Sequence, residues 1–111
     1  MFFKREVGID IVDVSRFKGF TKEDAFIQKT FTLYERDYCF LYTEPSTHLA
    51  GIFSAKEAVS KALGTVKFHV LMLEIRHDST GKPEAYREGK KLSVSVSISH
   101  TDTTAVAVAT A

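Results

Sequence analysis

Hydrophobic residues recur at helical spacing between Leu49 and Leu63. Read at about 100° per residue, one apolar stripe holds Ile52, Ala55, Ala58, Val59, Ala62 and Leu63. Glu57 and Lys61 are four residues apart and share the opposite face. Gly64 follows the last periodic residue, where helices commonly end in a left-handed turn. The pattern predicts a helix that Ser46 or Thr47 can open, with an acid and a base on its polar face.

The alternation of residues 7–12 predicts a strand with two unlike faces. Val7, Ile9 and Ile11 share one face, and Asp10 lies on the other. An unpaired buried carboxylate is costly, so Asp10 faces solvent on an edge strand, caps the following helix, or has a functional role. Asp13 and Ser15 are better helix caps, which weakens the capping alternative.

Further helical segments are predicted before residue 45. Residues 13–20 can begin a helix, although Gly19 interrupts it, and residues 21–24 offer a second start. Thr32 and Glu35 have the spacing of a capping box, and the helix they start is expected to run to about Leu41. The turn residues 43–46 separate it from the helix of Leu49 to Leu63.

The second half of the chain changes to a period of two. Residues 71–75 alternate as a half-buried strand, residues 78–83 are turn-forming, and residues 84–86 form a short strand before a turn around Gly89. Residues 92–98 alternate with serines, and residues 104–109 complete a C-terminal hairpin. Because helices precede antiparallel strands, we expect an α+β fold, with helices of the first half packed on an antiparallel sheet in one domain of residues 1–111.

The composition is that of a globular protein, and its small net charge produces no strong overall electrostatic field. Of 111 residues, 44% are hydrophobic and 26% charged, and the net charge is +1, so nothing global indicates nucleic acid or a membrane as partner. Cys39 is the only cysteine, which excludes an intrachain disulfide, and its apolar neighbours indicate a buried thiol. With no signal-like start and no apolar run of membrane-spanning length, we expect a cytoplasmic protein.

Several common chemistries find no support in the sequence. It has no Gly-rich phosphate loop, no cysteine pair for zinc and no His-Glu-x-x-His motif. His48, His69 and His77 lack partners at ligand spacing, and we expect each to be a surface or packing residue. Glu57 and Lys61 are either a surface ion pair or a carboxylate for a metal and an ammonium for a phosphate. Helical spacing does not separate these two alternatives.

Three motifs occur together in order along the chain: residues 8–12 (GIDIV), residues 54–65 (SAKEAVSKALGT) and residues 97–100 (SISH). With them the sequence resembles the small holo-acyl-carrier-protein synthases, the bacterial 4′-phosphopantetheinyl transferases. Residues 31–38 and 81–83 are also similar to that family. The resemblance spans nearly the whole chain.

The resemblance implies a reaction and a metal. Coenzyme A would donate its phosphopantetheine arm to a serine of apo acyl carrier protein and release adenosine 3′,5′-bisphosphate. The reaction would serve fatty acid biosynthesis. Asp10 and Glu57 would hold Mg²⁺ against the pyrophosphate, since this ion prefers one or two carboxylates, phosphate oxygens and waters. Lys61 would contact a phosphate oxygen.

The resemblance also implies further contacts. Coenzyme A would meet a group of backbone and side-chain sites formed by Gly64, Thr65, Gly81, Lys82, Pro83 and His100. Arg16 and Lys18 would dock the acidic carrier, with ordinary solvated charge as the alternative. Small members of the family are homotrimers with sites between neighbours, so Asp10, Glu57 and Lys61 would come from one subunit and the turn at residues 81–83 and His100 from the next.

The sequence departs from the family at two places. Val66 replaces a usual second glycine after Thr65, and the segment from Arg16 to Phe31 is shorter and less basic than usual. A non-catalytic homologue that binds a carrier or a nucleotide is the main alternative, although Asp10, Glu57, Lys61 and His100 are all retained. A larger subtype with two such halves is disfavoured by the length.

Overall fold

The computed structural model describes residues 5–64 and 69–111. The elements in chain order are β1 (Val7–Asp13), the 3₁₀ helix η1 (Val14–Phe17), α1 (Ala25–Thr30), α2 (Leu33–Cys39), α3 (Ser46–Leu63), the 3₁₀ helix η2 (Val70–Met72), β2 (Leu73–His77), β3 (Pro83–Arg87), β4 (Lys90–Lys91), β5 (Ser95–His100) and β6 (Thr104–Thr110).

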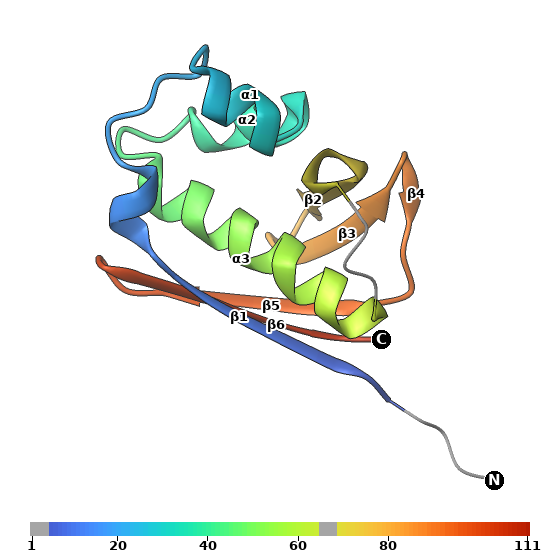
Figure 1. The fold of residues 1–111 in the computed structure, drawn as a ribbon. Coiled ribbons are helices and arrows are strands. Elements are labelled where there is room, and N and C mark those ends of the chain that lie inside the picture. Colours follow the sequence, from blue (N-terminus) through green and yellow to red (C-terminus); the bar gives the residue numbers. More distant parts are fainter. Residues whose placement is uncertain (1–4, 65–68) are drawn as a thin grey trace, which may run out of the picture.

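Two antiparallel sheets surround the long helix α3. One sheet has the order β1-β6-β5, so the first strand of the chain pairs with the last, and the other has the order β2-β3-β4. Figure 1 shows α3 crossing the first sheet, with α1 and α2 beyond it and the β2-β3 hairpin to one side. The predicted α+β class and the β5-β6 hairpin are confirmed.

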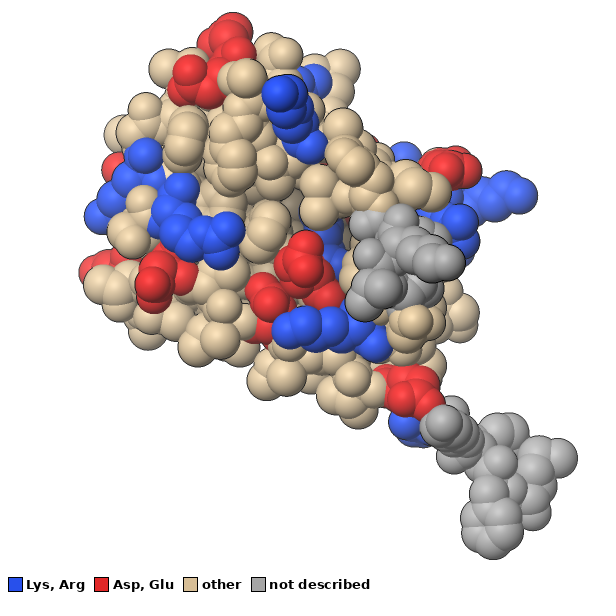
Figure 2. All heavy atoms as spheres, in the orientation of Figure 1, with Lys and Arg blue, Asp and Glu red and all other residues tan. Residues whose placement is uncertain are grey.

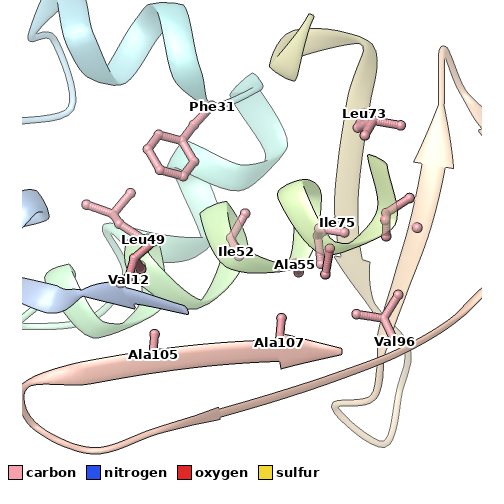
Figure 3. Close-up of a cluster of buried hydrophobic side chains, with 14 of the residues drawn as sticks. Val12, Phe31, Leu49, Ile52, Ala55, Leu73, Ile75, Val96, Ala105 and Ala107 are labelled. Atoms are coloured by element: carbon pink, nitrogen blue, oxygen red, sulfur yellow. The ribbon is translucent and has the colours of Figure 1, made fainter. Parts of the chain in front are cut away.

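The core lies where α3 meets these layers. The expected apolar stripe is buried, with Ile52, Ala55, Ala58, Val59 and Ala62 each at most 2% exposed. Figure 3 shows side chains from α3, the sheet and β2 converging on this core. The buried positions of β6 are three alanines, at residues 105, 107 and 109, and such small side chains allow a helix to lie close to a sheet.

Local signals placed several boundaries correctly. Thr32 and Glu35 form the predicted capping box with both reciprocal bonds. Gly64 ends α3 in the left-handed conformation at φ 71°, which glycine adopts without steric cost. Cys39 is fully buried, as its apolar neighbours indicated.

Other boundary predictions were wrong. The helix expected over residues 13–20 is only the four-residue η1, because Lys18 returns to extended backbone and Gly19 takes φ 81°. Residues 71 and 72 belong to η2, and the strand begins at Leu73. The strand expected over residues 92–98 begins at Ser95, after the short β4 hairpin diverts the chain. Predictions for Thr65 and Val66 fall outside the described residues.

Candidate active site

The side of β1 that packs against α3 carries Gly8, Asp10 and Val12. Gly8 and Val12 are buried and Asp10 is half-buried, whereas Val7, Ile9 and Ile11 on the other side are 60–68% exposed. The two faces of β1 are those predicted, but the face with the acid is the one that meets the helix. Asp10 therefore neither caps a helix nor faces open solvent, although β1 is an edge strand.

Lys61 reaches from α3 to this strand. Its ammonium lies 2.9 Å from the backbone oxygen of Ile9 and 3.3 Å from Asp10 Oδ1. The other oxygen of Asp10, Oδ2, is buried and has no hydrogen-bond partner among the described residues. Lys61 thus pairs with an acid on another element, and of the two alternatives left open by helical spacing, the surface pair with Glu57 is not the contact found among the described residues.

Glu57 lies one helical turn before Lys61 and shares its side of α3. It is half-buried, and its neighbour Ala58 packs against Gly8. Two carboxylates, one with an unpartnered buried oxygen, suit Mg²⁺, which takes few protein ligands and completes its shell with water and phosphate oxygens. No group of three or more potential metal ligands occurs in the described ranges 5–64 and 69–111.

A buried ion pair fixes the rotation of α3 next to this cluster. The Lys56 ammonium lies 2.7 Å from Glu35 Oε1 and donates to the Thr30 carbonyl at 3.0 Å. Glu35 also accepts from the backbone N–H groups of Thr32 at 2.9 Å and Ile75 at 2.8 Å. Burial raises the pKa of Glu35, against the opposing effect of Lys56, and lowers the pKa of Lys56.

This pair joins α2, α3 and β2, and so holds the helix segment that presents Glu57. The sequence pattern predicted Glu35 as a capping residue, and nothing in it singled out Lys56. An ion pair between residues 21 positions apart leaves no mark in local periodicity.

A second cluster lies around a cavity of about 240 Å³ on the β5 side of α3. Its walls include two of the residues predicted to meet coenzyme A on the β2-β3 turn, Gly81 and Pro83, and the predicted His100 of β5. They also include His48 of α3 and His77 of β2. Both histidines were expected to be only surface or packing residues, so the sequence missed their shared position.

Tyrosine rings stack on two of these histidines, His48 and His77. His48 stacks on Tyr42 with ring centroids 3.6 Å apart, and His77 stacks on Tyr38 at 4.1 Å. The rings of His48 and His100 lie 6.3 Å apart. Burial lowers the pKa of His48, with the neighbouring His100 and His77 acting in the same direction, and burial also lowers the pKa of His77.

The two clusters lie on opposite outer strands of one sheet. Asp10 is in β1 and His100 in β5, with β6 between them, which separates their backbones by roughly 10 Å across the strands. The helix α3 packs over this sheet between them. Within one chain, Asp10 and Lys61 are therefore brought together, and His100, Gly81 and Pro83 are brought together, but the two sets do not meet.

The remaining predicted residues lie at the surface. Lys82 is exposed, and its backbone N–H donates to Asp78 Oδ1 at 3.0 Å in the β2-β3 turn. The Arg16 guanidinium lies 5.7 and 5.3 Å from the ring centroids of Phe17 and Phe53. Lys18 is exposed. Figure 2 shows acidic and basic side chains intermixed on one face.

Among the described residues, no helix combines the length and the hydropathy needed to cross a bilayer.

Comparison with known proteins gives consistent results. Residues 6–111 match the family described as the 4′-phosphopantetheinyl transferase superfamily. A holo-[acyl-carrier-protein] synthase of Chlorobaculum parvum is 40% identical over 111 residues, covering 96% of this chain and 95% of the relative.

Solved structures agree with the sequence relatives. A holo-(acyl-carrier-protein) synthase from Bacillus anthracis, in complex with CoA (3′,5′-ADP), superposes with a TM-score of 0.80 and 34% identity, covering 95% of this chain and 93% of that one. The Helicobacter pylori holo-[acyl-carrier-protein] synthase in complex with coenzyme A has a TM-score of 0.76 and 30% identity, with coverage of 93% and 96%.

Proposed function

The chain belongs to the 4′-phosphopantetheinyl transferase superfamily, and we propose that it transfers the 4′-phosphopantetheine arm of coenzyme A to a serine of apo acyl carrier protein. The serine oxygen forms a bond to the phosphorus next to the pantetheine, and the bond from that phosphorus to the bridging oxygen breaks. Adenosine 3′,5′-bisphosphate leaves with the bonding electrons, and the serine proton is released. Fatty acid biosynthesis is the process this reaction would serve.

The observation that carries this proposal is the arrangement of Lys61 and Asp10. A lysine ammonium has three N–H donors, and two of the acceptors around Lys61 are the Ile9 carbonyl and Asp10 Oδ1. Among residues 5–64 and 69–111 the Lys61 ammonium meets no third acceptor, so its third donor would be available to a phosphate oxygen. In this position Lys61 would stabilise the charge that builds on the leaving phosphate.

Asp10 and Glu57 are the residues that would hold Mg²⁺. The unpartnered Oδ2 of Asp10 supports this assignment, because a buried carboxylate oxygen without a partner is costly unless something binds it. The chemistry that a bound magnesium ion supplies is polarisation of the attacked phosphorus and neutralisation of the leaving phosphate. The chain's own contribution is to fix both carboxylates on packed elements, one on β1 and one on α3.

A complete site would form between copies of the chain, in a homotrimer. The separation of Asp10 and Lys61 from the residues around His100 supports this, because coenzyme A would then bridge the first cluster of one copy and the second cluster of the next. The exposed apolar face of β1, with Val7, Ile9 and Ile11, is a surface that another copy would cover.

The acidic carrier would dock near the end of β1. Arg16 and Lys18 are both exposed, and Arg16 is held against two phenylalanine rings, which supports a fixed basic position at the surface. Such rim charges act mainly on the association rate. A cytoplasmic location is part of the same proposal.

The decisive test is mass spectrometry of apo acyl carrier protein incubated with coenzyme A, Mg²⁺ and this protein. A mass gain of one phosphopantetheine, absent when coenzyme A is omitted, is the expected result. A carrier that stays at its apo mass while the protein binds coenzyme A or carrier would favour the alternative, a non-catalytic binding homologue.

A further inference from the structure

In the described chain, the side chains lining the cavity beside α3 that can carry a positive charge are all histidines. Its lining in the described chain is Tyr38, Thr47, His48, Gly51, Ile52, His77, Gly81, Pro83, Ile98 and His100. This set includes three histidines but no lysine, arginine, aspartate or glutamate. Any positive charge that this wall offers to a ligand must therefore come from protonated imidazoles.

The histidine rings are spaced to act on one small anion. The centroids of His48 and His100 are 6.3 Å apart, which leaves room for a small anion that accepts N–H···O bonds of about 2.9 Å from ring nitrogens on both sides. One phosphate oxygen between the rings would be within reach of both. His77 adds an unsatisfied group, because its buried Nδ1 has no hydrogen-bond partner among the described residues.

The surroundings of His48 and His77 disfavour the charged form of each ring when no anion is present. Burial and the mutual repulsion of the imidazoles lower the pKa of His48, and burial lowers that of His77 although Asp78 opposes this. The titratable groups that act on or contact His48 are Tyr38 and Tyr42, from α2 and the loop after it, His77 from β2 and His100 from β5. Asp78 acts on His77, and Glu44 lies in the loop before α3. The Glu44 carboxylate is engaged by the Ser46 hydroxyl at 2.6 Å.

We propose that His48, together with His77 and His100, forms an ionisable subsite for a phosphate monoester of the donor, which takes up a proton when that monoester binds. The inference rests on the proposed function, in which the donor is coenzyme A, whose 3′-phosphate is such a monoester. His48 is then a specificity-determining residue that selects coenzyme A over dephospho-coenzyme A, and this selection strengthens as the pH falls.

The sign of the pH dependence follows from the charges. A phosphate monoester is a dianion above a pKa of about 6, and a dianion favours the protonated imidazole. Binding therefore raises the histidine pKa, so affinity grows as the pH falls from about 8 toward the unperturbed histidine value of about 6.5. Below about pH 6 the phosphate itself takes up a proton, which opposes the trend.

Calorimetry tests the subsite without turnover. Adenosine 3′,5′-bisphosphate is titrated into the protein in two buffers with different ionisation enthalpies, at about pH 7.5, where free histidine is neutral. We expect uptake of about one proton, and binding about fivefold to tenfold tighter at about pH 6.5 than at about pH 8. Dephospho-coenzyme A, which carries no phosphate monoester, should show neither effect.

Two variants locate the effect. In His48→Gln, which keeps a polar side chain but does not ionise, proton uptake should fall by at least half and the pH dependence should flatten. His69→Gln is the matched control, because His69 is exposed, outside the cavity wall, and serves only to cap η2. It should behave like the unmodified protein. Equal proton uptake with both nucleotides, or no difference between His48→Gln and the unmodified protein, would overturn the proposal.

Enzyme kinetics distinguishes this inference from the proposed function. The ratio of kcat/KM for coenzyme A to that for dephospho-coenzyme A should rise as the pH falls from about 8 to about 6.5, and should stay flat in His48→Gln. If phosphopantetheine is transferred from both donors and the ratio of their kcat/KM values does not change with pH, the subsite is rejected and the transferase function stands. Absence of any transfer, with proton uptake still seen by calorimetry, would reject the function and support the subsite.

Discussion

Gly8 of β1 lies so close to Ala58 of α3 that a Cβ at position 8 would stand 1.9 Å from the Ala58 carbonyl oxygen. The obstructing atoms are helix backbone, which cannot rotate away as a side chain can. The contact sets the distance between β1 and α3, and with it the approach of Asp10 to Lys61. The absence of a side chain at position 8 therefore helps to position the charged side chains of Asp10 and Lys61.

Gly8→Ala should therefore separate β1 from α3. We expect a loss of about 1–3 kcal/mol or more in the free energy of unfolding, the range for overpacked cores, measured by urea denaturation. Gly51→Ala is the control, because its Cβ would meet only the Ile98 methyl group at 3.0 Å, and alanine favours a helix. A Gly8→Ala protein as stable as Gly51→Ala would contradict this account.

Removing one member of the buried pair Lys56–Glu35 should be more harmful than removing both. Lys56→Met leaves an uncompensated carboxylate in a site where both side chains are fully buried, at an expected cost of about 3–5 kcal/mol. The double variant Lys56→Met with Glu35→Gln should recover part of that loss. Urea denaturation of the two single variants and the double variant gives the coupling energy. Additive losses would show that the two charges do not depend on one another.

Lys61→Met should lower kcat/KM by roughly a hundredfold or more, because a phosphate contact made in the transition state contributes a few kcal/mol. Lys61→Arg should rescue only part of the rate, since a planar guanidinium does not reproduce a compact ammonium. Lys22→Met is the matched control: Lys22 forms an exposed pair with Asp37. If Lys61→Met keeps kcat/KM within about threefold of the unmodified value at equal melting temperature, Lys61 has a structural role and not a catalytic one.

Activity should require a divalent ion. Chelation with EDTA is expected to abolish transfer, and added Mg²⁺ should restore it. Asp10→Asn and Glu57→Gln should each raise the Mg²⁺ concentration needed for half-maximal rate, because a neutral amide is a weaker ligand for a hard cation. Circular dichroism checks that both variants remain folded. Turnover that persists in EDTA would exclude the metal assignment.

Ile11→Lys should weaken self-association. Ile11 is 68% exposed on the apolar face of β1, and a lysine in a covered apolar interface carries a desolvation cost. Sedimentation equilibrium should show a trimer for the unmodified protein and smaller species for Ile11→Lys. Leu41→Lys is the control, since Leu41 is 83% exposed after α2 and away from this sheet. A monomeric unmodified protein with full activity would exclude sites shared between copies.

Local sequence patterns determined the elements whose causes are themselves local. The apolar stripe and Gly64 located α3, the Thr32–Glu35 spacing located the start of α2, and alternation located the final hairpin. The family motifs then selected Asp10, Glu57 and Lys61 as candidates. In each case the signal lies within a few residues, over which helix and strand geometry repeats.

Tertiary structure alone decided which partners these elements meet. Alternation in β1 separates its two faces but does not say which one packs, and here the close approach allowed by Gly8 turns the Asp10 face toward α3. Lys61 has Glu57 at helical spacing, yet it pairs with Asp10, 51 positions away. His48, His77 and His100 share a cavity because three separate elements converge there. Such contacts depend on how whole elements pack, and periodicity along one element carries no information about the surface opposite it.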